Sequence, residues 1–181
     1  LGEYRYSLWL DANITPACDP WSLVEEFGGG ADIVLHQHPH RSCAYDETAV
    51  CISMHKDLIS TLERQRRHYE QELFPHLHGL YETGVLLRRH SDAVSAFNER
   101  WWREVMEFSS RDQISFPFAL MKSPVTVARF PFPLRENSFL HYHHHESCPH
   151  RRYRAYLAAR RFAGRTLRAL YRAAQRPSAQ P

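Results

Sequence analysis

One stretch of this 181-residue chain decides its fold class: Tyr6-Ser7-Leu8-Trp9-Leu10-Asp11-Ala12-Asn13. The first five positions are mostly aromatic or aliphatic, which predicts a buried β-strand over residues 6–10. The polar residues Asp11 and Asn13 follow directly and end the strand. Because ligands of open α/β sheets bind at the carboxyl ends of the strands, this turn is the first candidate for a functional site.

Three further strands are expected, over residues 31–36, 83–88 and 125–130, because each is a short, largely apolar run. Predicted helices alternate with these strands along the chain. This order predicts an α/β fold, with a mixed sheet that carries helices on both faces. Beyond Pro133 the sequence is expected to form a loop up to about residue 151.

The first two helices are predicted from a cap and from apolar spacing. Asp19 as N-cap and Pro20 at the first helical position begin a short helix, which the glycines from Gly28 onward stop. The second helix is expected to run without a break from about residue 46 to 73, because its leucines and Tyr69 fall on one stripe.

Two more helices are expected in the second half of the chain. Apolar residues repeat at spacings of three and four over residues 94–108, which predicts an amphipathic helix. Ser110 as N-cap and Gln113 three residues on form a capping box that opens another helix. Pro117 is expected to kink or shorten that helix, because proline lacks a backbone N–H.

The composition supports one folded domain with a tail. Hydrophobic residues make up 43% of the chain and charged residues 24%, which suits a globular core and excludes disorder throughout. No run of eighteen apolar residues is present, so no membrane-spanning helix is expected. Residues 1–150 are expected to form the domain, incomplete at its N-terminus, and residues 151–181 a basic helical tail.

The net charge of +3 is unevenly distributed. Residues 151–181 contain nine arginines and no acid, so they carry +9 and residues 1–150 carry −6. A nucleic-acid-binding domain places its positive charge on the folded face, so no nucleic-acid partner is expected. Residues 151–176 form an amphipathic pattern that suits an anionic membrane surface, and equally a helix packed on a neighbouring domain or left in solvent.

Asp11 and Asn13 are the first candidate metal ligands. Side chains at i and i+2 of an extended segment project to the same side, so their oxygens can hold one divalent cation. Mg²⁺ and Mn²⁺ accept carboxylate, amide and phosphate oxygens together. The alternative is an Asx turn that leaves the strand and binds nothing.

Five motifs in order along residues 5–122 resemble one known family. They are Trp-Leu-Asp-Ala-Asn-Ile (9–14), His-Pro-x-Arg-x-Cys-x-Tyr-x-Glu (38–47), Gly-Leu-Tyr-Glu-Thr (79–83), Arg-Arg-His (88–90) and Trp-Trp…Ser-Ser-Arg-Asp-Gln-Ile-Ser-Phe (101–116). Together they are similar to the TOD/MUCI-type glycosyltransferase-like family, formerly a domain of unknown function. Its members include plant mucilage-related proteins and bacterial polysaccharide-locus proteins.

The resemblance implies a GT-A-like fold and a nucleotide-sugar donor. In such folds a DxD-type motif holds Mn²⁺ or Mg²⁺ against the donor diphosphate, and Asp11 and Asn13 match its positions. Asparagine in the second place removes one charge and weakens the expected hold on the metal. GT-A folds also open with strands that bind the nucleotide base, and nothing before Tyr4 corresponds to them, so the chain is expected to lack those strands.

Asp112 is the expected catalytic residue. It lies in the first turn of its helix, where the helix dipole favours a carboxylate by up to about 1 kcal/mol. By resemblance to the Asp-Gln motifs of GT-A enzymes, Asp112 faces the sugar or the acceptor hydroxyl, with Arg111 and Gln113 as substrate-binding neighbours. The alternative is an aspartate that only opens the helix.

Five more residues are candidates for substrate binding. His38 and Arg41 follow a strand, and an arginine offers bidentate contacts to a phosphate or carboxylate. Glu82 and Arg89 lie in two of the other motifs. Trp102 is expected to be freer than its neighbour in the core stripe, and therefore able to line a sugar site. Surface or packing roles remain the alternatives for all five.

Five of the thirteen histidines lie in residues 141–150. By resemblance to GT-A enzymes that supply a late histidine ligand, His143 is the candidate to complete the metal site. A solvent-exposed histidine run is the alternative. A histidine-rich metal hydrolase is a third interpretation, which the absence of an HExxH motif disfavours.

The leading hypothesis is a glycosyltransferase that moves a sugar from a nucleotide-sugar donor to a glycan or lipid-linked acceptor. The alternative is a non-catalytic sugar- or partner-binding module that retains the fold. The four cysteines show no paired spacing, which favours reduced thiols in a cytosolic protein. The expected location is the cytoplasm or inner membrane surface in a bacterium, and the Golgi in a eukaryote.

Overall fold

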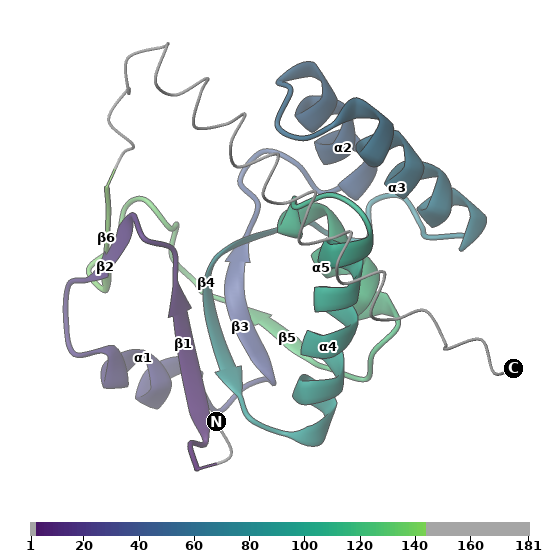
Figure 1. The fold of residues 1–181 in the computed structure, drawn as a ribbon. Coiled ribbons are helices and arrows are strands. Elements are labelled where there is room, and N and C mark those ends of the chain that lie inside the picture. The colour runs from purple at the N-terminus through teal and green to yellow at the C-terminus, as the bar shows by residue number, and fades with distance from the viewer. Residues whose placement is uncertain (1–2, 144–181) are drawn as a thin grey trace, which may run out of the picture.

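The computed structural model describes residues 3–143, which form a mixed α/β fold. A four-stranded sheet has the order β1-β4-β3-β5 (Figure 1). Its strands are β1 (Tyr6–Leu10), β3 (Ile33–Gln37), β4 (Tyr81–Arg89) and β5 (Val127–Arg129). β4 runs antiparallel to both neighbours, β1 and β3, whereas β3 and β5 are parallel. The four predicted strands are therefore confirmed, with bounds shifted by up to two residues.

Helices cover both faces of this sheet, as predicted (Figure 1). On one face, Val34 and Leu87 pack with Leu23 of α1 (Pro20–Phe27). On the other face, residues one step along the same strands pack against α4 (Asp92–Glu107) and α5 (Asp112–Met121). Because successive side chains of a strand point to opposite faces, both central strands are apolar and buried at their centres, at residues 33–35 and 85–87.

The first predicted helix, α1, is confirmed together with its cap. The Asp19 carboxylate accepts a hydrogen bond from the backbone N–H of Trp21 at 3.0 Å, and Pro20 occupies the first helical position. The backbone N–H of Gly28 donates to the Val24 carbonyl at 2.8 Å and closes the last turn.

The single helix predicted over residues 46–73 is wrong. The structure has two helices there, α2 (Ala44–Ser53) and α3 (Ile59–Gln71), which pack beside the sheet (Figure 1). The buried Asp57 causes the break. Its carboxylate accepts from the backbone N–H of Leu58 at 2.7 Å and from the backbone N–H of Ser110 at 2.8 Å. A long-range contact therefore overrides a continuous local pattern.

The same contact corrects the predicted capping box. The Ser110 hydroxyl donates to Asp57 at 3.0 Å instead of capping α5, which begins at Asp112 with Arg111 in the N-cap position. Pro117 lies inside α5, and the helix continues beyond it to Met121. Ser110 therefore stabilises the turn between α2 and α3 rather than the N-terminus of α5.

The loop predicted beyond Pro133 contains a short strand, which is a second correction. β6 (Leu140–Tyr142) pairs antiparallel with β2 (Ile14–Pro16), which follows directly on the Asp11 turn. Neither three-residue strand has a periodic signal of its own. The predicted tail helix over residues 151–176 lies outside the described residues. Within residues 3–143, no helix is long and apolar enough to cross a membrane.

Candidate functional site

The candidate site lies at the edge of the sheet where β1, β3 and β5 end. These strands all run in one direction, so the residues that follow them, including Asp11 and His38, meet at one edge. The antiparallel strand β4 begins at the same edge with Glu82 and Thr83 near its start. Carboxyl ends of strands are where open α/β sheets bind ligands.

An irregularity in β4 shapes this edge. Leu35 pairs with Leu86, but the next residue of β3 pairs with Glu82, so the register shifts across residues 83–85. The Gly84 carbonyl within the shift accepts from the backbone N–H of Asp11 at 2.8 Å. A Cβ at Gly84 would lie 3.1 Å from Oδ2 of Asp11. The absence of a side chain at Gly84 therefore leaves space for the Asp11 carboxylate. β-Bulges commonly redirect side chains next to functional sites.

A cavity of about 390 Å³ opens on the α4–α5 face of this edge. We call it the tryptophan pocket, because three of its lining residues are tryptophans. It is lined by Trp9, Asp11, Thr83, Leu86, Arg88, Asn98, Trp101, Trp102, Val105 and Asp112. Aromatic walls with a few polar groups at defined positions are typical of ligand sites.

The two candidate aspartates enter this pocket from different elements. Asp11 follows β1, and its Oδ1 accepts from the indole N–H of Trp9 at 3.3 Å. Asp112 begins α5, and its Oδ2 accepts from the Thr83 hydroxyl at 2.7 Å. Its Oδ1 accepts from the backbone N–H of Gln113 at 3.0 Å. The tertiary structure thus brings together two carboxylates that are about a hundred residues apart in the chain.

Both adjacent tryptophans of α4 line the pocket. Trp101 packs edge-on against Phe116 and donates its indole N–H toward the Asp112 carbonyl at 3.2 Å. Trp102 is 57% exposed, so its indole is available to a ligand. Trp101 therefore supports the helix that carries Asp112, while Trp102 forms an accessible wall.

Asn13 and His143 lie together beside Asp11. The Asn13 amide nitrogen donates to the His143 carbonyl at 3.1 Å, and the backbone N–H of His143 donates to the Asn13 carbonyl at 2.8 Å. The imidazole Nε2 of His143 lies 2.9 Å from the hydroxyl of Thr15. The backbone of His143, the predicted third metal ligand, therefore lies beside Asn13, whereas its imidazole ring contacts the Thr15 hydroxyl.

The donor set here is small. Among residues 3–143, no group of three or more histidine, cysteine, aspartate or glutamate side chains gathers in a way that could hold a metal ion. One carboxylate and one amide suit a cation that takes its other ligands from phosphate oxygens and water, as Mg²⁺ usually does. They do not suit a cation held by protein alone. The histidines of residues 144–150 lie outside the described part of the chain.

His38 and Arg41 form a cluster with the buried Glu47. The Arg41 Nε lies 2.6 Å from Oε2 of Glu47, and an Arg41 Nη2 lies 3.0 Å from Nε2 of His38. The Nδ1 of His38 accepts backbone N–H groups of the loop at 3.1 and 3.2 Å. Burial and the neighbouring Arg41 lower the pKa of His38. The cluster fixes the loop between β3 and α2.

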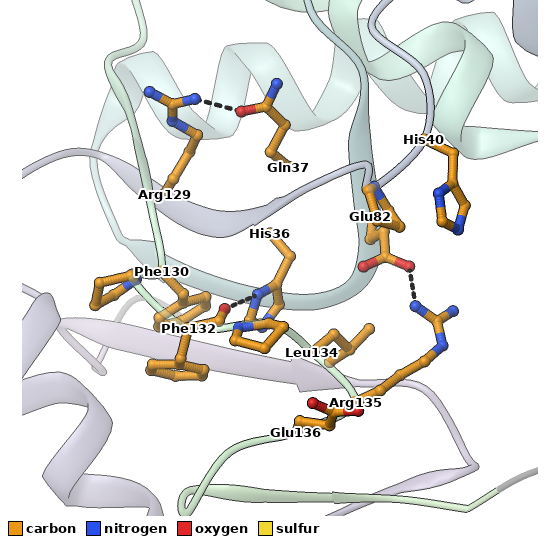
Figure 2. Close-up of a pocket in the computed structure, with 13 residues that line it drawn as sticks. His36, Gln37, His40, Glu82, Arg129, Phe130, Phe132, Leu134, Arg135 and Glu136 are labelled. Atoms are coloured by element: carbon orange, nitrogen blue, oxygen red, sulfur yellow. Dashed lines mark hydrogen bonds and ion pairs between the residues drawn. The ribbon is translucent and has the colours of Figure 1, made fainter.

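A larger cavity of about 760 Å³ opens at the same edge beside β3 and β5, and its centre is His36 (Figure 2). We call it the His36 cavity. His36 is only 2% exposed, and its Nδ1–H donates to the Phe132 carbonyl at 3.1 Å. Burial lowers the pKa of His36 to about 4, with Arg135 contributing. Glu82 pairs with Arg135 at 3.0 Å and points into this cavity rather than into the tryptophan pocket.

The remaining predicted residues lie apart from the tryptophan pocket. Arg89 is at the far end of β4, where it pairs with Asp32 at 2.6 Å. Arg111 and Gln113 flank Asp112 but line neither of the two cavities. Sequence reasoning missed Trp9, Thr83, Arg88 and Asn98 as pocket residues. Strand alternation could have indicated Trp9, which lies on the same side as Asp11, and Thr83 and Arg88 lie in two of the quoted motifs.

These features define a mixed α/β domain with a candidate ligand site at the carboxyl edge of its sheet, and comparison with known proteins identifies its family. Residues 1–145 match the family described as TOD1/MUCI70, glycosyltransferase-like domain. The chain belongs to this family. The predicted resemblance is therefore confirmed over most of the chain.

A curated relative is the "Probable hexosyltransferase MUCI70" of Arabidopsis thaliana. It is 30% identical to this chain over 122 residues, which are 62% of this chain and 21% of the relative. The chain thus spans about a fifth of that protein's length. No solved structure matches the chain significantly.

Proposed function

We propose that this domain is a hexosyltransferase that takes a sugar from a nucleotide-sugar donor and transfers it to a glycan or lipid-linked acceptor. The observation that carries the proposal is the presence of Asp11 and Asp112 in one tryptophan-lined pocket at the carboxyl edge of the sheet. The family membership and the named relative support sugar transfer as the type of reaction.

In this proposal the donor diphosphate lies beside the Asp11 turn, as in a GT-A-like enzyme. Asp11 and Asn13 would hold Mn²⁺ or Mg²⁺, which would neutralise the charge that develops on the departing diphosphate. His143 would join them only if its ring left Thr15. Gly84 keeps the Asp11 carboxylate in place, because any larger residue would crowd it.

The sugar of the donor would lie on the tryptophans, facing Asp112. Thr83 and the backbone of Gln113 hold the two oxygens of this carboxylate, so its orientation is fixed before a substrate arrives. A carboxylate so placed can accept a proton from the acceptor hydroxyl or stabilise positive charge on the sugar ring. The acceptor would approach from the open edge, near the loop that carries His38 and Arg41.

The test is thermal stabilisation by UDP and by GDP, each with and without Mn²⁺. We expect an increase in Tm for one of the nucleotides that requires the metal and is lost in Asp11→Ala. Asp19→Asn is the matched control, because it removes a carboxylate at an exposed turn while keeping a good helix cap. No stabilisation by either nucleotide in a folded chain would contradict the donor site.

A non-catalytic sugar-binding module is the second candidate. The asparagine at position 13 and the small donor set among residues 3–143 favour it. Such a module would bind a glycan in the tryptophan pocket without any response to nucleotide or metal. Sugar binding that survives Asp11→Ala, with no nucleotide effect, would favour the module over the enzyme.

A further inference from the structure

Arg88 is a charged residue of the tryptophan pocket, and its side chain hydrogen-bonds to a neutral partner. Its Nη1 donates to the amide oxygen of Asn98 at 3.1 Å, and its Nε is buried without a hydrogen-bond partner. Within residues 3–143 no carboxylate forms an ion pair with it. Burial lowers the pKa of Arg88, but arginine starts so high that the guanidinium remains charged.

Three other arginines near the sheet have a carboxylate partner, whereas Arg129 donates to the amide oxygen of Gln37 and Nε of Arg111 is buried without a partner, as in Arg88. Arg41 pairs with Glu47 at 2.6 Å, Arg89 with Asp32 at 2.6 Å, and Arg135 with Glu82 at 3.0 Å. A partly buried charge without a partner is destabilising, because the protein only partly replaces its lost hydration. A ligand that brings a negative charge would remove this penalty.

The negative and positive side chains of the tryptophan pocket lie at opposite ends of it. Asp11 follows Leu10, which pairs with Val85, whereas Arg88 lies three residues further along β4. At about 3.3 Å per residue this places the backbone of Arg88 roughly 10 Å along the strand from Val85, which lies opposite the residue before Asp11. Asp112 lies with Asp11 on the carboxylate side, since Thr83 binds it. An anionic substituent is therefore attracted to one end and repelled from the other.

The walls between the two ends are suited to sugar rings. Trp9 is 53% exposed and, like Trp102, presents an indole to the cavity. An aromatic face packs against the C–H groups of a pyranose, while the polar groups around it bind hydroxyls. The guanidinium fork of Arg88 matches a carboxylate or phosphate in a bidentate contact.

We infer that the tryptophan pocket selects a sugar with a negatively charged substituent, and that Arg88 is the residue that binds this substituent. The inference rests on the proposed function, since it names the class of sugar that the same pocket would take. The charged group is a carboxylate, as in a uronic acid, or a phosphate ester on the sugar. The carboxylate end of the pocket fixes which way the sugar lies.

The experiment compares three sugars that share one ring: glucose, glucuronic acid and glucose 6-phosphate. Binding to the folded chain is followed by tryptophan fluorescence, because three of the four tryptophans line the pocket. We expect at least one of the two anionic sugars to bind about tenfold or more tighter than glucose, the effect of one charge-assisted contact. Which of the two binds tighter identifies the carboxylate or the phosphate as the recognised group.

Two variants remove the guanidinium's action in different ways. Arg88→Gln removes the positive charge. Asn98→Asp keeps the arginine but gives its guanidinium a carboxylate partner within the protein. Both are expected to reduce the preference for the anionic sugars to about twofold or less. The control is Arg103→Gln, which removes the same charge from an exposed position of α4 outside the pocket.

Three results with the sugars and the two variants would overturn the inference, and a fourth comes from the control. They are equal binding of all three sugars, no binding of any of them, and a preference that survives in both Arg88→Gln and Asn98→Asp. A loss of preference in Arg103→Gln as large as in Arg88→Gln would also overturn it, as a general charge effect. The proposed function is judged separately, by the metal-dependent nucleotide effect and its loss in Asp11→Ala.

Discussion

The two aspartates of the tryptophan pocket, at the carboxyl edge of the sheet, have different hydrogen-bond partners from Asp32 at the opposite end. At the carboxyl edge, Asp11 accepts a hydrogen bond from Trp9, and Asp112 accepts from Thr83 and a backbone N–H, all neutral donors. At the opposite end, Asp32 accepts from the Arg89 guanidinium at 2.6 Å. It also accepts from the Thr126 backbone N–H at 2.9 Å and from the Thr126 hydroxyl at 2.7 Å.

This difference in partners indicates that Asp32 stabilises the fold, whereas Asp11 and Asp112 are available to a ligand. The hydrogen bond from Arg89 and those from Thr126 lower the pKa of Asp32 to about 2, so the folded chain favours its ionised form. No described residue forms an ion pair with Asp11 or Asp112. A carboxylate held in an ion pair, as Asp32 is, contributes stability, whereas a carboxylate held by neutral donors can exchange them for substrate.

The largest effect is expected at the carboxyl edge, from Asp112→Asn. Loss of the carboxylate should lower the rate of sugar transfer by about 10²–10⁴-fold, the usual contribution of a positioned acid or base. The free energy of unfolding should change by no more than about 1 kcal/mol, because the amide oxygen still accepts one of the two hydrogen bonds. The measurements are transfer or donor hydrolysis and urea unfolding.

Asp92→Asn is the matched control for that experiment. Asp92 occupies the same first-turn position in α4 that Asp112 occupies in α5, and it does not line the tryptophan pocket. If both variants lost activity equally, the effect would belong to helix stability. A fully active Asp112→Asn enzyme would contradict the assigned role.

Gly84→Ala is expected to have the next largest effect. The added Cβ would lie 3.1 Å from Oδ2 of Asp11 and 3.3 Å from Cδ1 of Ile14, so the carboxylate must shift by a few tenths of an ångström. We expect metal-dependent nucleotide binding to weaken about tenfold. Titration of the nucleotide with and without Mn²⁺ measures this. Gly30→Ala is the control, since a Cβ there meets nothing within 4 Å. Unchanged binding in Gly84→Ala would show that the position of Asp11 is not critical.

Asp32→Asn should affect stability instead of function. Near pH 6 we expect a loss of about 1 kcal/mol in the free energy of unfolding, reduced from the full ion-pair value because Arg89 is half exposed. The folded pKa is below the unfolded value of 3.8, so this stability is present above pH 4 and is lost as the pH falls toward 2. Urea unfolding across that range measures it. A difference that persisted at pH 2 would contradict the ion-pair explanation.

The smallest effect is expected from Glu104→Gln, away from both ends of the sheet. Burial raises the pKa of Glu104 to about 7, and its Oε2 accepts the Tyr69 hydroxyl at 3.1 Å. The folded chain then holds a proton that the unfolded chain releases near pH 4.5, so stability falls as the pH rises from 4.5 through 7. At pH 8 the glutamine variant should be more stable by about 0.5–1 kcal/mol. Chemical unfolding of the natural chain and of the variant at pH 5 and pH 8 measures the pH dependence of their stability. A variant with the same pH dependence as the natural chain would exclude Glu104 as the cause.

The elements predicted from sequence were those with strong local signals. The strand before Asp11 was a short apolar run, and α1 had the Asp19 cap followed by Pro20, so both were found. The long helix over residues 46–73 failed, because the contact between Asp57 and Ser110 joins residues 53 positions apart. Helical periodicity also placed Leu73 in the core, yet it lies beyond the end of α3 and is 86% exposed.

The candidate site divides in a similar way. Asp11 and Asp112 could be named in advance, because Asp11 ends a buried strand and Asp112 lies in a motif that resembles the Asp-Gln motifs of GT-A enzymes. Thr83 and Arg88 lie in two of the five motifs, but the motifs do not show that their side chains line a pocket, and Asn98 lies in none of them. They become pocket residues only when α4 packs against β4.

The sequence by itself determined the fold class, the family and the turn at which ligand chemistry is expected. Those properties follow from apolar runs, caps and ordered motifs, which act over a few residues. Only the tertiary structure decided that Asp11 and Asp112 share a pocket, that Arg89 pairs with Asp32 at the opposite end of the sheet, and that Arg88 has no ion-pair partner among residues 3–143. Pairing and burial depend on which distant segments pack together, and side chains of the same type therefore differ in role.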